Sequence, residues 1–360
     1  MTESSLVSAV RTSPENVLED YGKAMRQADY QEHLPKDRTT IIKLNLSWSL
    51  YYPACSTEPW QLEGVLQTLR EDGYEDVVAM ENKTVVTDPL KGVEQNKWGR
   101  VLDKYQVDFV PLTEVQWIPY QPESDTPGIE KTFPDGHRIP EPFLNTNVLH
   151  LPTIKTHGHT TMTGAMKNAF GGLITERRHQ AHKYIHEVLV DLLKIQKEIH
   201  TGIFAVMDGT VCGDGRGPRT MEPVIKDIIL ASGDQVAIDS VSAGLMGFDP
   251  LEIPKLKMAD GLGLGNADPS HIKVLGADIS DEDWEFDQGQ SLVIWADKLF
   301  RKGALSFLEP FLFHTPLFKL PILGSAVYHD YFWYPLIGRK KINQFMTTKW
   351  GNLLKTYDRK

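Results

Sequence analysis

Short apolar runs alternate with segments of helical periodicity along most of this 360-residue chain, and this alternation constrains the fold more than any other feature. Thr39–Leu46 is rich in β-branched residues and predicts a buried strand, and Glu58–Glu71 follows it with one apolar stripe at helical spacing. Such an order favours an α/β fold with a mainly parallel sheet flanked by helices. Further strands are expected at Asp76–Met80, Val107–Leu112, Asn147–Pro152, Ile203–Met207, Val224–Ala231 and His271–Leu275, and further helices at Val93–Tyr105, Gln180–Ile199, Gln235–Met246 and Ile253–Asp260.

The alternation extends over residues 39–290, which we interpret as one α/β domain with a Pro-rich, irregular insertion at residues 113–146. Residues 1–38 are expected to form a helical lead-in, because Ser13-Pro14-Glu15 resembles a helix start. Residues 291–360 are expected to form a helical, aromatic C-terminal extension. From Lys298 onward there are eleven Lys or Arg against three acids, although the whole chain has a net charge of −10.

Composition excludes several classes of protein. The acidic net charge argues against nucleic-acid binding by the body of the protein. The two cysteines, Cys55 and Cys212, lie far apart and form no CxxC pair, so no intrinsic iron–sulfur cluster and no cysteine-ligated zinc site are expected. Because the N-terminus lacks a basic segment followed by an apolar run, we expect a cytoplasmic protein.

Leu151–Gly172 holds the densest group of polar residues that could carry chemistry. An apolar run ends there and is followed by Lys155, Thr156 and His157, and a short helix-like piece then carries Lys167 and Asn168. In open parallel sheets, ligands bind beyond the carboxyl ends of the strands, where helix N-termini also favour anions. The stretch therefore predicts a donor-rich binding site.

Other predicted strands also end in polar residues, which suggests that these residues converge on one site. In that site, lysines and amides would bind a small anionic substrate, and a histidine or carboxylate would move a proton. The expected substrate-binding residues are Lys43, Asn45, Lys155, Thr156, Lys167 and Asn168, and the expected catalytic residues are His157, Asp208 and Glu81.

A divalent metal is a candidate cofactor, because His182 and His186 have the i, i+4 spacing of a metal-binding pair on a helix. Asp208 or Asp191 could complete such a site, whereas the alternative is a helix whose first turn is merely rich in histidine. The glycine-rich segments at 213–218 and 261–265 lack the order of nucleotide-binding motifs and predict tight turns. Asp239, inside an apolar helix, is expected to have a structural role.

The C-terminal extension is rich in aromatic residues between 305 and 337, and Arg339-Lys340-Lys341 follows them. Prolines and polar residues interrupt the stretch, so it is not expected to span a membrane. Three interpretations fit it: a peripheral membrane contact through residues 305–341, an arm of a homodimer, or a lid packed on the domain.

Four segments, in order, resemble the family called domain of unknown function 362: PTIKTHGHTTMTGAMKNAFGG, VMDGTVCGDGRGP, ILASGDQVAIDSVSAGLMGFDP and ADGLGLGNADPSHIKVLG. The strand IIKLN at 41–45 resembles that family's early segment, so the likeness extends over roughly residues 39–278. Relatives are often fused to ferredoxin-like modules, which implies a redox link, but this chain lacks the cysteine cluster. The family's motif positions fall on Lys43, Asn45, Lys155, Thr156, His157, Thr163, Gly164, Lys167, Asn168, Asp208, Gly209, Asp234 and Asp239.

Two functions follow from these observations. The first is an enzyme that acts on a small anionic substrate at the strand ends, with a metal as candidate cofactor. The second is a non-catalytic binding or maturation protein that serves an iron–sulfur or redox partner protein, or a membrane surface, through its basic, aromatic C-terminus.

Overall fold

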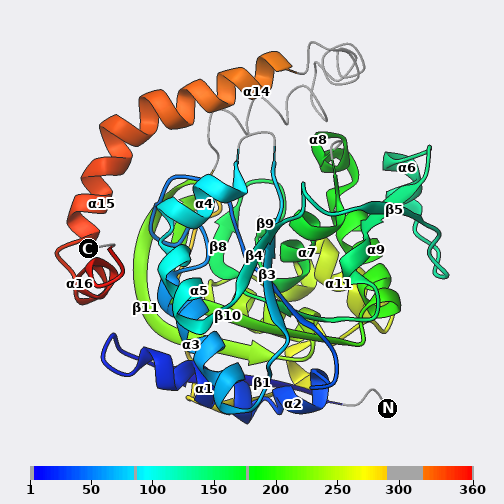
Figure 1. Ribbon diagram of the computed structural model, residues 1–360, viewed down its shortest axis with the longest axis horizontal. Helices are drawn as coiled ribbons and strands as arrows, with labels where there is room; N and C mark the ends of the chain where they lie inside the picture. The colour runs from blue at the N-terminus through cyan, green and yellow to red at the C-terminus, as the bar shows by residue number, and fades with distance from the viewer. Residues whose placement is uncertain (1–3, 85–86, 176–177, 290–318, 359–360) are drawn as a thin grey trace.

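The computed structural model describes residues 4–84, 87–175, 178–289 and 319–358, and a ten-stranded sheet forms its centre (Figure 1). The strand order is β12-β1-β11-β10-β7-β2-β3-β4, and β8 pairs with both β10 and β9. The strands are β1 (Ser5–Arg11), β2 (Thr40–Lys43), β3 (Val77–Glu81), β4 (Asp108–Pro111), β7 (Asn147–His150), β8 (Thr153–His157), β9 (Thr161–Met162), β10 (Gly202–Arg216), β11 (Thr220–Ser232) and β12 (Ile272–Gly276).

Strands β4, β3, β2, β7 and β10 pair in parallel, which confirms the predicted α/β fold with a mainly parallel sheet. Lys43 at the end of β2 is in register with Met80 of β3 and with His150 of β7. Because parallel strands end at the same edge, the side chains that follow them are brought close together there.

Helices cover both faces of the sheet (Figure 1). One face carries α1 (Val17–Gln27), α3 (Pro59–Glu71) and α5 (Trp98–Tyr105), and the apolar side chains of these helices share a core with the sheet. The other face carries α7 (Ala165–Leu173), α9 (Ile185–Ile199), α10 (Gln235–Leu245) and α11 (Pro254–Gly261). Shorter helices are α2 (Tyr30–His33), α4 (Pro89–Gln95) and α8 (Arg178–Ala181), with 3₁₀ turns at Glu141–Phe143, His182–Tyr184, Pro250–Glu252 and Pro269–His271.

The expected helical lead-in is wrong for its first residues, although α1 lies within it. Ser5–Arg11 forms β1, which pairs antiparallel with β11 and parallel with β12. Both partners lie more than 200 residues away along the chain, so local periodicity does not reveal this strand.

The expected tight turn at 213–218 is also wrong, because β10 continues to Arg216 and forms a long hairpin with β11. β10 first pairs with β7 and then, past Asp208, with β8. Gly213 is needed where the strands approach closely: a Cβ there would lie 2.4 Å from the sulfur of Met221 and 3.0 Å from the Cβ of Lys155. Lys155, Thr156 and His157 therefore belong to a strand rather than to a polar turn.

The insertion at 113–146 is not irregular throughout. It contains a small antiparallel sheet of β5 (Trp117–Tyr120) and β6 (His137–Pro140), with α6 (Pro127–Thr132) between them. The carboxylate of Asp191 on α9 accepts hydrogen bonds from the backbone N–H groups of Gly128 and Ile129, at 2.7 and 3.0 Å. Asp191, a proposed metal ligand, therefore anchors the start of α6 on α9.

The C-terminal extension is helical where it is described and wraps around the outside of the domain (Figure 1). It consists of α14 (Lys319–Ala326), the π-helix η7 (Val327–Gly338), α15 (Arg339–Phe345) and α16 (Lys349–Lys355). Trp350 and Leu354 of α16 are buried in the core beneath α1 and α3, so the end of the chain is anchored to the domain. Residues 291–318 lie outside the described part of the chain. Within the described residues, no helix is long and apolar enough to cross a membrane.

Candidate functional site

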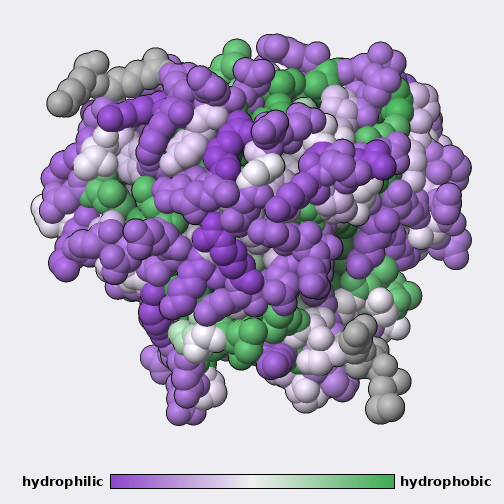
Figure 2. Space-filling view, turned by 60° about the horizontal axis from the view of Figure 1, so that its bottom comes forward, coloured by the Kyte–Doolittle hydropathy of each residue, from purple (hydrophilic) through white to green (hydrophobic). Residues whose placement is uncertain are grey.

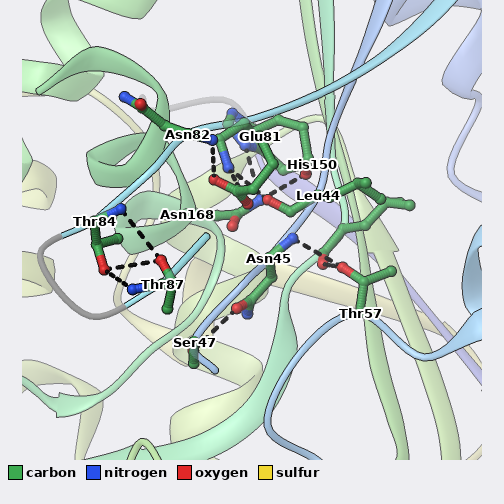
Figure 3. Close-up of polar contacts among 12 residues, drawn as sticks. Leu44, Asn45, Ser47, Thr57, Glu81, Asn82, Thr84, Thr87, His150 and Asn168 are labelled. Atoms are coloured by element: carbon green, nitrogen blue, oxygen red, sulfur yellow. Dashed lines mark hydrogen bonds and ion pairs between the residues drawn. The ribbon is translucent and has the colours of Figure 1, made fainter. Parts of the chain in front are cut away.

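The ends of β2, β3 and β7 meet in a buried network around Lys43. Its Nζ donates to the Glu81 carboxylate at 2.8 Å and to the backbone carbonyl of Leu44 at 2.5 Å, and both side chains are almost fully buried. Figure 3 shows the side chains of Glu81, Asn168 and His150 converging beside Leu44. Because its charge is matched inside the protein, Lys43 is built into the fold rather than turned toward a ligand.

Asn168 and His150 complete this network. Asn168 Nδ2 donates to the Lys43 carbonyl at 2.9 Å and lies 3.3 Å from Nδ1 of His150, and Nε2 of His150 lies 2.7 Å from Oε1 of Gln196. A neutral imidazole that donates at Nε2 and accepts at Nδ1 satisfies both contacts. Burial, chiefly, lowers the pKa of His150 to about 4, so it is neutral at physiological pH.

Asn45 lies on the loop that leaves β2, at the rim of the network (Figure 3). Its side-chain oxygen accepts from the hydroxyl of Ser47 at 3.1 Å, and its backbone N–H donates to the hydroxyl of Thr57 at 2.9 Å. These bonds hold the loop on the start of α3.

Lys155 and Asp208 lie in a second buried group, on the face of α3. Lys155 Nζ donates to the Cys55 carbonyl at 2.9 Å, and burial lowers its pKa to about 8. Burial raises the pKa of Asp208 to about 6, and burial together with Asp208 raises that of Glu58 to about 8. All three groups are fully buried, and the positive charge of Lys155 lowers the pKa of both carboxyl groups, so they form an internal acid–base group.

Asp239, on α10, fills the N-terminus of α7. Its carboxylate accepts from the N–H groups of Ala165 and Met166 and pairs with Lys255 at 3.0 Å, with both side chains completely buried. Gly164 permits this approach, because it has a φ of 95° and a Cβ there would overlap the carboxylate. The expected structural role of Asp239 agrees with these contacts, and the anion preferred by this helix end is supplied by the protein itself.

His157 lies at the end of β8 in a third group, the histidine cluster, which we define as His157, His159, Lys167 and His182. The ring centroids of His157 and His159 are 5.9 Å apart, and the His159 ring stacks on that of His182 at 5.0 Å. Lys167 is half-buried, with its Nζ 5.6 Å from the centre of the Phe170 ring.

His157 is held neutral in this cluster. Burial lowers its pKa well below the ordinary value, and the neighbouring cations Lys167, His159, His182 and Lys255 lower it further. Its Nδ1 accepts from the backbone N–H of His159 at 3.1 Å, which places the proton on Nε2. Nε2 has no hydrogen-bond partner within the described part of the chain. His157 thus presents a neutral N–H donor rather than a proton acceptor.

The helix expected at Gln180–Ile199 is divided into α8, a 3₁₀ turn and α9. His182 lies on the 3₁₀ turn and His186 on α9, so the pair is not on one regular α-helix. Among the described residues, no group of three or more His, Cys, Asp or Glu side chains is placed to hold a metal.

By their contacts, the predicted site residues fall into three groups. Lys43, Glu81 and Asn168 form the first, Lys155 and Asp208 the second, and His157, Lys167 and His182 the third. Thr156 links strands through its hydroxyl, which donates to the Gly215 carbonyl at 2.9 Å. Sequence reasoning missed His150, Gln196 and Lys255. Their hydrogen-bond and ion-pair partners lie on other elements, so the local sequence does not identify them.

Comparison with known proteins supports the resemblance seen in the sequence. The model of a family described as a domain of unknown function, DUF362, matches residues 40–244, which is more than half of the chain. A thylakoid-associated protein of Synechocystis sp. is 27% identical over 234 residues, which cover 64% of this chain and 69% of that protein.

A crystal structure of a Thermotoga maritima protein superposes on this chain with a TM-score of 0.40 and 9% sequence identity. The superposition covers 69% of this chain and 59% of the other.

Proposed function

The chain belongs to the DUF362 family, and we propose that it is an enzyme whose histidine cluster binds a small anionic substrate at the end of β8. The observation that carries the proposal is the neutral imidazole of His157, whose Nδ1 accepts from the His159 backbone while its Nε2–H is bonded to no residue of the described chain. A donor that lies at the end of a strand and is not used within the described chain can bind a ligand oxygen there.

Lys167 supplies the positive charge that an anion requires, and it lies close enough to His157 to lower its pKa. A neutral imidazole donor beside a cation can bind a carboxylate or phosphate oxygen and can stabilise negative charge that develops there during a reaction. In this proposal His157 polarises the substrate rather than removing a proton from it.

Glu81 and Asp208 are then positioning residues. Glu81 is committed to Lys43, and one oxygen of Asp208 accepts the backbone N–H of Thr210 at 2.6 Å. Glu81 thereby joins the ends of β2 and β3, and Asp208 lies in β10 where that strand begins to pair with β8. A divalent metal at His182 and His186 stays a prediction; the ring that stacks on His182 is that of His159.

Calorimetric titration of the full chain with inorganic phosphate and with oxalate tests the proposal. We expect at least one to bind, and His157→Leu to weaken that binding about tenfold or more, because a hydrogen bond to a charged group contributes roughly 1.5–3 kcal/mol. His157→Gln keeps an N–H donor and should bind nearly as well as the wild type. Lys167→Gln should also weaken binding, and Lys257→Gln, at an exposed position of α11, is its matched charge control. Equal binding by His157→Leu, or no binding by the wild type, would overturn the proposal.

A second candidate function is association with a membrane surface. It is supported by the name of the Synechocystis relative, which describes that protein as thylakoid-associated, and by large apolar side chains exposed along the C-terminal helix of this chain. Sedimentation of the full chain with lipid vesicles tests it, and failure to sediment with any vesicle would contradict it.

A further inference from the structure

Six large apolar side chains are exposed on one continuous helical segment, α14 to η7. They are Leu323, Val327, Tyr331, Phe332, Leu336 and Ile337, which we call the outer stripe, and their exposed fractions range from 42% to 78%. Elsewhere in the described residues, the exposed large apolar side chains Leu90, Ile225, Leu262 and Val274 lie on different elements. The face of the molecule drawn in Figure 2 is mainly hydrophilic, with small hydrophobic patches.

The outer stripe faces outward because the opposite side of the helix is fixed to the domain. Trp333 packs against Trp48 and Tyr52, with ring centroids 6.1 and 5.4 Å away. The hydroxyl of Tyr334 donates to the Tyr51 carbonyl at 2.9 Å, and Trp48 Nε1 donates to Asp330 at 2.7 Å. The helix therefore cannot turn its apolar side onto the domain without breaking these contacts.

The charge beside the outer stripe is positive. Arg339 and Lys340 follow it and are exposed, whereas Lys341 turns inward and pairs with Glu222. The acid within residues 319–349 is Asp330, whose carboxylate is directed at Trp48. The whole chain has a net charge of −10, whereas this segment is positively charged and is therefore suited to an anionic surface.

We propose that the outer stripe lies in the interface of an anionic lipid bilayer, with Arg339 and Lys340 at the headgroups. An exposed apolar helix face with aromatic residues and adjoining basic residues has the pattern of an interfacial helix. The basic residues favour lipid over a neutral apolar partner, because they add attraction to anionic headgroups. This inference rests on the second candidate function, association with a membrane.

The position of the helix links the bilayer to the strand ends. Trp48 and Tyr52, which hold η7, belong to the loop that leaves β2 after Asn45. In Figure 1, α14 lies at the end of the molecule where the loops after the parallel strands also lie. A protein docked through the outer stripe would therefore hold its strand-end loops close to the membrane.

Co-sedimentation of the full chain with vesicles tests the inference. One set of vesicles contains phosphatidylglycerol and phosphatidylcholine in equal parts, and the other contains phosphatidylcholine alone. We expect binding to the anionic set that weakens at high salt. The variant Phe332→Ser/Leu336→Ser should bind about tenfold less or weaker still, because it removes two buried apolar groups from the interface. Arg339→Gln/Lys340→Gln should lose roughly fivefold per charge.

The double variant Leu90→Ser/Leu262→Ser is the matched control, because it changes two leucines that are each 58% exposed and belong to other elements, α4 and the end of α11. It should bind vesicles as the wild type does, and all variants should keep the unfolding midpoint of the wild type. If the wild type binds and both serine variants bind equally well, the outer stripe is not the docking surface, although membrane association stands. If the wild type binds neither set of vesicles, both are overturned. A dimer that the Phe332→Ser/Leu336→Ser variant dissociates, without vesicle binding, would assign the outer stripe to a second copy and overturn the inference.

Discussion

Two buried histidines on consecutive strands, His150 on β7 and His157 on β8, differ in how the protein uses their ring nitrogens. Burial is the first cause of a lowered pKa in both, to about 4 for His150 and well below the ordinary value for His157. Both nitrogens of His150 have partners, Gln196 and Asn168, whereas His157 uses Nδ1 alone. His150 therefore completes an internal network, whereas the Nε2–H of His157 can donate to a ligand.

The lysines near these histidines differ in burial and in their neighbours. Lys43 is almost fully buried and is matched by Glu81, whereas Lys167 is half-buried and lies beside aromatic and histidine rings. A lysine at a strand end is thus no guide to anion binding until its internal partners are known. Where the chain supplies the counter-charge, the residue stabilises the fold.

Removing the charge of Lys43 should have the largest effect on stability. Lys43→Ala leaves Glu81 as an unpaired buried carboxylate, so the free energy of unfolding should fall by about 3–5 kcal/mol. Urea unfolding followed by circular dichroism measures this difference. A loss below about 1 kcal/mol would mean that the pair is solvated and that the network is not closed.

The double variant Lys43→Met/Glu81→Leu separates the cost of an unpaired charge from the cost of lost packing. Replacing both partners with apolar residues of similar size is often neutral or stabilising, so it should recover most of the loss. If the double variant is as unstable as Lys43→Ala, the hydrogen bonds from Lys43 to the backbone, and not its charge pairing, dominate.

Stability should also fall in acid because of His150. Its pKa is about 4 in the folded protein and about 6.5 when unfolded, so between these values the unfolded state binds more protons. The free energy of unfolding should therefore decrease as the pH falls from 6.5 to 4, by up to about 3 kcal/mol from this residue. Urea unfolding across that range measures the slope.

His150→Gln removes the titrating group while it keeps a side chain that can hydrogen-bond. The variant should have a shallower pH dependence than the wild type over the same range, even if its stability at neutral pH is lower. Identical slopes would show that other buried histidines, such as His137 with a pKa of about 4, account for the acid sensitivity.

His157→Leu should cost less stability than a comparable change in the closed network. It removes one hydrogen bond, from the backbone N–H of His159, so a loss of about 1 kcal/mol is expected. His150→Leu removes two contacts and leaves Gln196 and Asn168 without a partner ring, so it should cost more. Equal losses for the two variants would contradict the distinction between His150, whose two ring nitrogens both have partners, and His157, which uses Nδ1 alone.

Much of the fold was predictable where the signal is local. The apolar runs of β2, β3 and β7 and the stripe of α3 identify these elements. Asp234 caps α10, accepting from the N–H groups of Val236 and Ala237. β1 and the second half of β10 were missed because their pairing is set by distant partners and, in β10, by glycines that fit a crowded strand.

The candidate site was predictable only as a location. The residues Lys155 to Asn168 were identified, but their roles depend on register and burial: Lys43 pairs with Met80 across the sheet, which brings Glu81 next to its ammonium group. Lys255, on α11, comes 16 residues after Asp239 of α10, and its ammonium group pairs with that buried carboxylate. Sequence spacing contains no measure of such distances, so charge neutralisation inside the fold could not be foreseen.

Lys167→Gln should have the smallest effect on the fold and still remove ligand-dependent stability. Because Lys167 is only half-buried, the free energy of unfolding without ligand should change by less than about 1 kcal/mol. A bound anion at 100 times its Kd stabilises the folded state by about 2.7 kcal/mol, so excess phosphate should raise the unfolding midpoint of the wild type. The variant should gain much less, and Lys257→Gln should gain as much as the wild type. If excess phosphate raises the unfolding midpoint of Lys167→Gln as much as that of the wild type, the anion binds elsewhere. Lys167 would then not be the cation that binds substrate beside His157.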